Sequence, residues 1–291
     1  MKTTLTDKDR ATYFLEGDYK NLYIPQFSLA FIINPKAGGT SLKKYAHELH
    51  KHKEKQSDNL LTNCPSLPEN LIKATNQIYK AYVVRNPWDR LVSCYVQKRE
   101  YDRKRFYRMN RIDSNISFKD FVHFVCGTPD YKSDHHFRSQ FTKIINPDGQ
   151  IIVDYIMRFS RLQDDFLDLR FAKNLPEINL PHLNKTNRTH YTEYYTDDLI
   201  KLVEERYRVD VEMFNFEYAK VKDAKIQLPV VHKLSLSNQI EIFKYIGQRA
   251  EWRLAYLNQN FVPKPNSFRD KLKLFLGVNS KRELLKNFKI H

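Results

Sequence analysis

Residues 29–41, LAFIINPKAGGTS, join a short apolar run to a turn rich in glycine. The run is continuous rather than alternating, which is typical of a strand buried on both faces of a sheet. Residues 41–55 then carry apolar side chains at helical spacing along one face. The stretch therefore predicts a strand, a tight loop and a helix as the first unit of the fold.

The same order of strand, turn and helix recurs after residue 78. Residues 79–84 predict a second strand, Asn86 is a good N-cap, and Pro87 suits the first turn of the next helix. Alternating strands and helices indicate an α/β fold with a central, mainly parallel sheet flanked by helices. The further elements expected are a strand over 151–159 and helices over 118–125, 131–141, 164–171, 196–214 and 235–260.

The chain of 291 residues divides by composition into three segments. We expect an irregular lead-in over residues 1–27, the α/β domain over 28–220 and a basic, helical C-terminal extension over 221–291. Residues 264–291 are rich in Lys and Arg and predict a solvated basic helix, with peripheral contact to an anionic membrane as the alternative. Because the N-terminal segment is polar, neither a signal peptide nor a transmembrane segment is expected.

The formal net charge is +15, from 49 Lys and Arg against 34 Asp and Glu. Such an excess predicts an anionic partner, whether nucleic acid, membrane, acidic glycan or polyphosphorylated cofactor. Cys64, Cys94 and Cys126 lie far apart without a CxxC pair, which indicates free thiols in a reducing compartment. We therefore expect a cytoplasmic protein. No metal site is expected, because no cysteine or carboxylate completes a ligand set around the histidines of residues 47–52.

The loop after the first strand has the properties of a phosphate or sulfate cradle. Gly38 and Gly39 let the backbone approach a ligand closely, and N–H groups at the start of a helix attract an anion. Thr40 and Ser41 add hydroxyl donors, and Lys36 adds a positive charge. A plain glycine turn that caps a helix is the alternative. Lys36 precedes both glycines, whereas in the ATP-binding P-loop the Lys follows the second Gly, which argues against an ATP hydrolase.

The end of the second strand predicts another anion contact. Arg85 follows the strand and Ser93 lies in the next helix, so both reach the carboxyl edge of the sheet, where ligands bind in open α/β folds. Arg offers bidentate contacts to phosphate, and Ser offers a hydroxyl. We expect Arg90 on the surface, and Trp88 and Tyr95 in the core.

Together the two turns resemble the motifs of a known family. Residues 35–41, PKAGGTS, resemble the 5′-phosphosulfate-binding loop of sulfotransferases, and residues 83–95, VVRNPWDRLVSCY, resemble their 3′-phosphate-binding motif. The resemblance covers roughly residues 28–218. Further landmarks similar to those of the family 2 carbohydrate sulfotransferases follow in the same order: HHFRSQ, VDYIMRF, LPHLNKTNR and YYTDDLIKLVEERYRVDVEMFNFEY.

The resemblance implies a P-loop-like three-layer fold and a transferase that needs no metal. The donor it implies is 3′-phosphoadenosine-5′-phosphosulfate (PAPS), with PAP as product. The acceptor it implies is a hydroxyl of a carbohydrate, neutral or acidic, in a glycan, polysaccharide or glycolipid, and nucleic acid is not an expected partner. The cofactor-binding residues implied are Pro35, Lys36, Ala37, Gly38, Gly39, Thr40 and Ser41 at the 5′-phosphosulfate, Arg85 and Ser93 at the 3′-phosphate, and Lys185 and Arg188 in a loop that closes over the site.

Catalysis is expected to follow phosphoryl transfer, an in-line displacement in which positioning and charge stabilisation dominate. We expect Lys36 to stabilise the leaving phosphate. As the base that takes the acceptor's proton we predict His136, with His135 as the second candidate, because HHFRSQ matches a histidine-containing landmark of the family. A structural role for both histidines is the alternative.

Three positions depart from the family's usual residues. Ala37 replaces Thr and removes a hydroxyl from the cradle, Ile33 stands where many bacterial relatives have His, and Ser160 stands where the family often has Glu. A weakened or altered enzyme is therefore one expectation. Two other classes stay open: a basic nucleic-acid-binding protein, which the +15 charge supports, and a nucleotide kinase with an aberrant P-loop.

Overall fold

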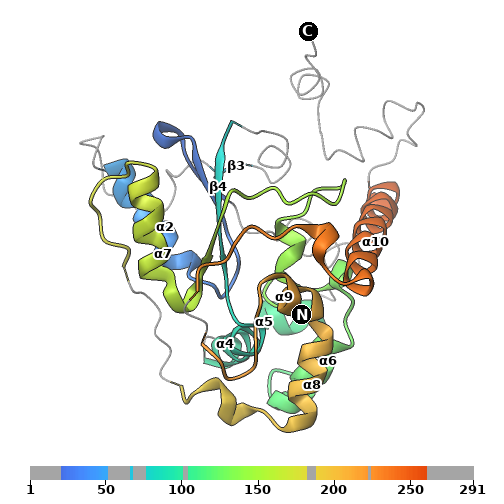
Figure 1. Ribbon diagram of the computed structural model, residues 1–291. Helices are drawn as coiled ribbons and strands as arrows, with labels where there is room; N and C mark the ends of the chain where they lie inside the picture. Colours follow the sequence, from blue (N-terminus) through green and yellow to red (C-terminus); the bar gives the residue numbers. More distant parts are fainter. Residues whose placement is uncertain are drawn as a thin grey trace.

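The computed structural model describes residues 21–51, 66–67, 77–100, 104–181, 188–221 and 224–260. Its centre is a five-stranded sheet in the order β3-β1-β2-β4-β5. Helices α2 (Gly39–Lys51) and α7 (Leu162–Ala172) cover one face, and α4, α6 and α8 lie on the opposite side (Figure 1). The described part of the chain therefore has the three layers expected of a P-loop-like α/β fold.

The three strands that carry the site run parallel. β2 (Leu29–Ile32) pairs with β4 (Tyr79–Val84), and β4 pairs with β5 (Tyr155–Arg158), with Val84 opposite Arg158. The turns that follow these strands are therefore gathered at one edge of the sheet. The prediction of a sheet with a parallel centre is confirmed.

Two antiparallel strands extend the sheet beyond β2. β1 (Asn21–Ile24) pairs with β2 on one side and with β3 (Ser66–Leu67) on the other. The expectation of irregular structure up to residue 27 is therefore wrong for β1. Leu22 and Ile24 are buried, and a short 3₁₀ turn, η1 (Pro25–Phe27), brings the chain back so that these side chains reach the core.

Alternate residues of the strands face two separate cores. One core includes Phe31, Ala81 and Met157 and lies under α2 and α7, whereas the other includes Ala30 and Tyr82 and lies under the helices of the opposite layer. The remaining helices are α4 (Pro87–Glu100), α5 (Lys104–Asn110), α6 (Phe118–Cys126), α8 (Asp197–Arg206), α9 (Arg208–Met213) and α10 (Leu236–Asn260). The remaining 3₁₀ turns are η2 (Asp130–Lys132), η3 (Gln140–Lys143), η4 (Phe159–Arg161), η5 (Tyr191–Tyr194) and η6 (Val231–Lys233).

Two of the helix predictions are wrong: one segment forms turns, and the other forms two shorter helices. Residues 131–141 form turns and parts of η2 and η3, because Ser133 and Asp134 bond the local backbone instead of allowing a helical ladder. Residues 196–214 form α8 and α9 with a break at Tyr207, whose hydroxyl donates to the carbonyl of Phe137. The expected strand over 151–159 is shorter than predicted, because β5 begins only at Tyr155.

The described part of the C-terminal extension packs against the main domain. Ile242 of α10 is fully buried in the core of the opposite layer. Residues 261–291, including the basic segment expected to be helical, lie outside the described residues. None of the helices in the described ranges is long and apolar enough to cross a membrane.

Candidate active site

The turns after β2 and β4 are in direct contact at the carboxyl edge of the sheet. Arg85 Nη1 donates to the carbonyl oxygen of Lys36 at 2.7 Å, and Arg90 Nε donates to the carbonyl oxygen of Pro35 at 3.1 Å. Arg85 follows β4, whereas Lys36 and Pro35 belong to the turn after β2. The two predicted anion contacts therefore lie side by side.

The first turn has a strained backbone. Lys36 and Gly38 both have positive φ, at +70° and +77°, and α2 begins directly afterwards at Gly39. N–H groups in the first turn of an α-helix have no acceptor within the helix, so those of α2 are available to an anion. A Cβ atom at Gly38 would lie 2.8 Å from Leu162 Cδ2, so a larger residue would have to displace this methyl group as well as adopt an unfavourable positive φ.

Gly38→Ala is expected to lower the free energy of unfolding by about 2 kcal/mol, because alanine is strained at positive φ and its Cβ clashes with Leu162. Gly247→Ala is the matched control, since an added Cβ meets nothing within 4 Å in α10. The control is expected to be neutral or slightly stabilising. Urea unfolding of both variants measures the difference, and equal stabilities would contradict the account of this turn.

The second turn is held by charged hydrogen bonds. Asn86 Oδ1 accepts from the N–H of Trp88 at 3.1 Å and caps α4, as predicted. Arg85 Nε donates to Asp89 Oδ2 at 2.6 Å, and Arg188 forms an ion pair with the other oxygen of Asp89. Burial alone would raise the pKa of Asp89, but Arg85 and Arg188 hold it below its usual value. Asp89 thus stays ionised and aligns both arginines.

A cleft of about 510 Å³ opens beside the two turns. Four of the predicted residues, Ser41, Arg85, Ser93 and Arg188, line it. Arg188 Nη1 is buried and has no hydrogen-bond partner among the described residues, so the cleft holds a donor that an anionic ligand could satisfy. The cleft is also lined by Val84, Asn86, Asp89, Arg158, Phe159, Ser160, Arg161, Leu162, Gln163, Asp164, Pro181, Thr189, His190, Tyr191, Phe216, Lys220 and Val221.

The ammonium group of Lys36 is partly desolvated. Its Nζ donates to Gln97 Oε1 at 2.9 Å. Burial lowers the pKa of Lys36 to about 8, and the positive charges of Arg85, Lys98 and Arg188 act in the same direction. A bound anion would relieve this repulsion, so the electrostatics of the turn favour a negatively charged ligand.

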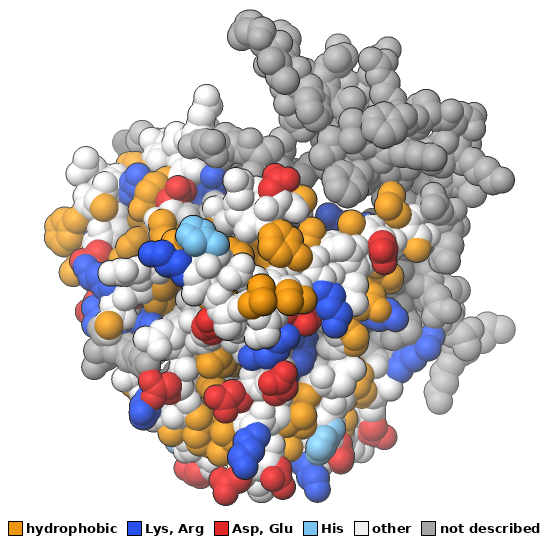
Figure 2. Space-filling view, turned by 45° about the vertical axis from the view of Figure 1, so that its right-hand side comes forward, with side chains coloured by type: hydrophobic (Ala, Val, Ile, Leu, Met, Phe, Trp, Pro, Cys, Tyr) orange, Lys and Arg blue, Asp and Glu red, His pale blue; other side chains and the backbone are white. Residues whose placement is uncertain are grey.

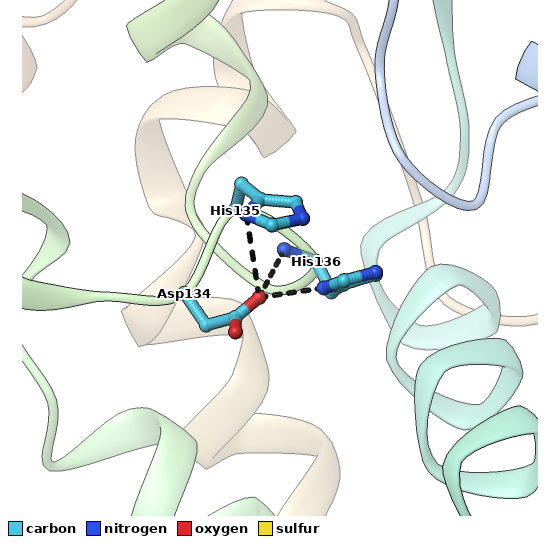
Figure 3. Close-up of side chains that lie close together, drawn as sticks. All are labelled: Asp134, His135 and His136. Atoms are coloured by element: carbon cyan, nitrogen blue, oxygen red, sulfur yellow. Dashed lines mark hydrogen bonds and ion pairs between the residues drawn. The ribbon is translucent and has the colours of Figure 1, made fainter. Parts of the chain in front are cut away.

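The rings of His135 and His136 lie 4.1 Å apart, and both face one oxygen of the buried carboxylate of Asp134 (Figure 3). His136 Nδ1 lies 2.6 Å from Asp134 Oδ1, and its Nε2 points toward α4 and lies 3.0 Å from Lys98 Nζ. Because the Lys98 ammonium can only donate, Nε2 is the acceptor and Nδ1 carries the proton. Burial lowers the pKa of His136, although Asp134 opposes this shift, so the ring is neutral near pH 7.

The same three side chains bring together atoms that could ligate a metal. One ligand atom each from Asp134, His135 and His136 lies within 4.8 Å of the others. However, the ammonium of Lys98 occupies the open nitrogen of His136, and a fixed positive charge disfavours a cation there. The arrangement is better described as a hydrogen-bonded chain from Asp134 through His136 to Lys98.

The family model described as the sulfotransferase family matches residues 19–217, more than half of the chain. The chain belongs to the sulfotransferase family. No curated protein and no solved structure matches it significantly. The resemblance to family 2 sulfotransferases is confirmed, and the match includes both turns and all three strands of the parallel centre.

The expectation for Arg90 of this sulfotransferase is wrong. Arg90 was expected on the surface, but it is 3% exposed and donates to the carbonyl oxygens of Pro35, Arg138 and His135. These acceptors come from two distant segments, so the pattern of α4 alone could not reveal them. Trp88 is in the core, as expected.

Several site residues of the sulfotransferase were missed from the sequence. Asp89 and Gln97 were missed although they recur at four-residue spacing on either side of the predicted Ser93, which places them on the same face of α4, so their spacing was an available signal. Lys98 and Gln140 carried no comparable local signal, because His136, which bonds Lys98, and Asn34, which bonds Gln140, lie 38 and 106 residues away. Lys185 lies outside the described residues.

The three departures from the family pattern have different surroundings. Ala37 and Ile33 are both buried in the core beneath α2, where an apolar side chain is well accommodated. Ser160 is exposed in η4 and lines the cleft. The loss of the usual acid at Ser160 therefore affects the cleft of the sulfotransferase directly.

Proposed function

We propose that this sulfotransferase transfers a sulfuryl group from PAPS to a hydroxyl of a carbohydrate, without a metal ion. The observation that carries the proposal is the contact between the two strand-end turns, joined by the bond from Arg85 to the carbonyl of Lys36, beside one cleft. A volume of about 510 Å³ lies within the range of pockets that hold nucleotide-sized ligands.

The residues fit a donor with two anionic ends. The turn from Pro35 to Ser41 would hold the 5′-phosphosulfate through Lys36 and the N–H groups at the start of α2. Arg85 and Ser93 would hold the 3′-phosphate, and both line the cleft. Arg188 Nη1, which has no hydrogen-bond partner in the described part of the chain, supports an anion at this position.

PAPS, when bound, supplies the sulfuryl group and the leaving phosphate. In the proposed mechanism the Lys36 ammonium stabilises the negative charge that develops on the leaving side, together with the helix N-terminus. His136 takes the proton of the acceptor hydroxyl at Nε2, while Asp134 fixes the tautomer through Nδ1. Because Nε2 is held by Lys98, the acceptor hydroxyl must replace that hydrogen bond before the proton moves.

The carbohydrate acceptor rests on the family motifs, and the basic surroundings of Lys36 and Lys98 support an acidic sugar among the acceptors. A screen of neutral and acidic glycans with labelled PAPS tests this class directly. Labelling of proteins or small phenols alone would overturn the carbohydrate assignment. The free thiols of Cys94 and Cys126 support the proposed cytoplasmic location.

The two other function classes make different predictions for ligand binding. On the face drawn in Figure 2, Lys and Arg are interspersed with Asp and Glu over the described part, which does not favour the continuous basic stripe of a nucleic-acid-binding protein. Calorimetric titrations with PAP, ATP and a random oligonucleotide separate the classes. Tight PAP binding without magnesium supports the proposal, whereas magnesium-dependent ATP turnover or binding of the oligonucleotide alone would reject it.

His136→Ala is expected to lower kcat for sulfuryl transfer by about 10²–10⁴-fold, because it removes the proposed base. The affinity for PAP is expected to stay near that of the unchanged protein, since His136 does not line the cleft. Transfer assays and calorimetry measure the two effects. His232→Ala is the control, because His232 lies in η6 and does not line the cleft. Full activity of His136→Ala would remove the base assignment.

A further inference from the structure

The side chain of Gln140 joins the ends of β2 and β4. Its Oε1 accepts from Asn34 Nδ2 at 2.8 Å and from the N–H of Arg85 at 2.9 Å, and its Nε2 donates to the carbonyl oxygen of Arg85 at 2.8 Å. Gln140 is 1% exposed. One buried amide thus bonds the first residues of both turns, and both lone pairs of its oxygen are used.

The backbone of Gln140 is held by hydrogen bonds from other elements. The carboxylate of Asp210, which is fully buried in α9, accepts from the N–H of Gln140 at 2.7 Å and from the N–H of Phe141 at 2.9 Å. The hydroxyl of Tyr82 donates to the carbonyl oxygen of Gln140 at 2.9 Å. The backbone of Gln140 is therefore held by α9 and β4, and its side chain extends from this fixed point to both turns.

We propose that Gln140, anchored by Asp210, is a positioning residue that fixes the spacing of the two turns so that both ends of one bis-anionic ligand bind at once. The identity of that ligand as PAP or PAPS rests on the proposed function. A ligand held at two sites gains affinity only when their separation matches its own. We call the hydrogen bonds from the Gln140 side chain to the two turns the clamp. Loss of the clamp therefore lowers the affinity for a ligand that spans both turns much more than the affinity for a ligand that contacts one.

The test compares PAP, 5′-AMP and 3′-AMP binding to Gln140→Leu by calorimetry. The variant is expected to bind PAP with about 10-fold to 100-fold lower affinity, since three buried hydrogen bonds are lost. Its affinity for each mononucleotide is expected to change by less than about threefold. Thr142→Val is the matched control, because Thr142 is buried in the same 3₁₀ turn and its hydroxyl donates to the carbonyl of Ser139. Equal weakening of all three ligands, or none, would overturn the clamp.

A second measurement needs no ligand. Amide hydrogen exchange in residues 33–42 and 84–93 is expected to accelerate together in Gln140→Leu and to stay unchanged in Thr142→Val. If Gln140→Leu fails to fold, Asp210→Asn, which keeps one acceptor oxygen, is expected to give the same pattern more weakly. Absence of PAP binding to the unchanged protein would reject the proposed function alone. Unchanged exchange in both turns would reject the clamp alone.

Discussion

Arg85→Ala is expected to weaken PAP binding by about 100-fold or more, which calorimetry without magnesium would record as loss of measurable heat. The substitution removes the guanidinium proposed for the 3′-phosphate and the bond to the Lys36 carbonyl. It also leaves the partly buried carboxylate of Asp89 with Arg188 as its partner, so Arg188 becomes less available to a ligand.

Two variants separate charge from geometry at this position. Arg85→Lys keeps the charge but loses the planar fork, so PAP affinity is expected to be intermediate. Arg170→Ala is the control for removal of a positive charge, because Arg170 lies on α7 and pairs with the exposed Glu177. If Arg85→Ala bound PAP with an affinity within about twofold of that of the unchanged protein, this result would contradict the proposed site.

Lys36→Met is expected to lower kcat for transfer by about 10²–10³-fold, the size typical of removing one charge-stabilising donor. Transfer is expected to fall more than PAP affinity, because charge on the leaving phosphate grows during the reaction. Lys44→Met, an exposed position on α2, is the control. Equal losses in affinity and in transfer would show that Lys36 only binds.

The pH profile tests the same lysine independently. With a pKa of about 8 in the free protein, Lys36 is charged below that pH and loses its proton above it. The value of kcat/KM for PAPS is therefore expected to fall as the pH rises through about 8. Lys36→Arg is expected to remove this fall, since a guanidinium stays charged. A flat profile across this range in the unchanged protein would contradict the role of the ammonium.

The features that could be predicted from the sequence are local ones. Three predicted features depend on residues within a few positions of one another, and all three are present. They are the strand over 79–84, the cap at Asn86 and the glycine turn before α2. The meeting of the two turns followed from a general property of parallel sheets, whose carboxyl ends share an edge.

The features that could not be predicted depend on distant partners. The Asn34–Gln140 bond spans 106 positions, and Arg90 is buried by carbonyls from two other segments. Residues 131–141 were expected to be helical, but Ser133 and Asp134 bond the backbone locally, and the segment forms turns that contact Arg90 and Asn34 instead. Local side-chain bonds to the backbone in residues 131–141, and bonds to distant segments at Asn34 and Arg90, thus decided the places where periodicity was misleading.

A crystal structure with PAP bound tests most directly whether one donor spans the two turns. We expect the 5′-phosphate within hydrogen-bond distance of Lys36 and the N–H groups at the start of α2, and the 3′-phosphate on Arg85 and Ser93. PAP bound at only one of these turns, or outside the cleft that they border, would contradict the account.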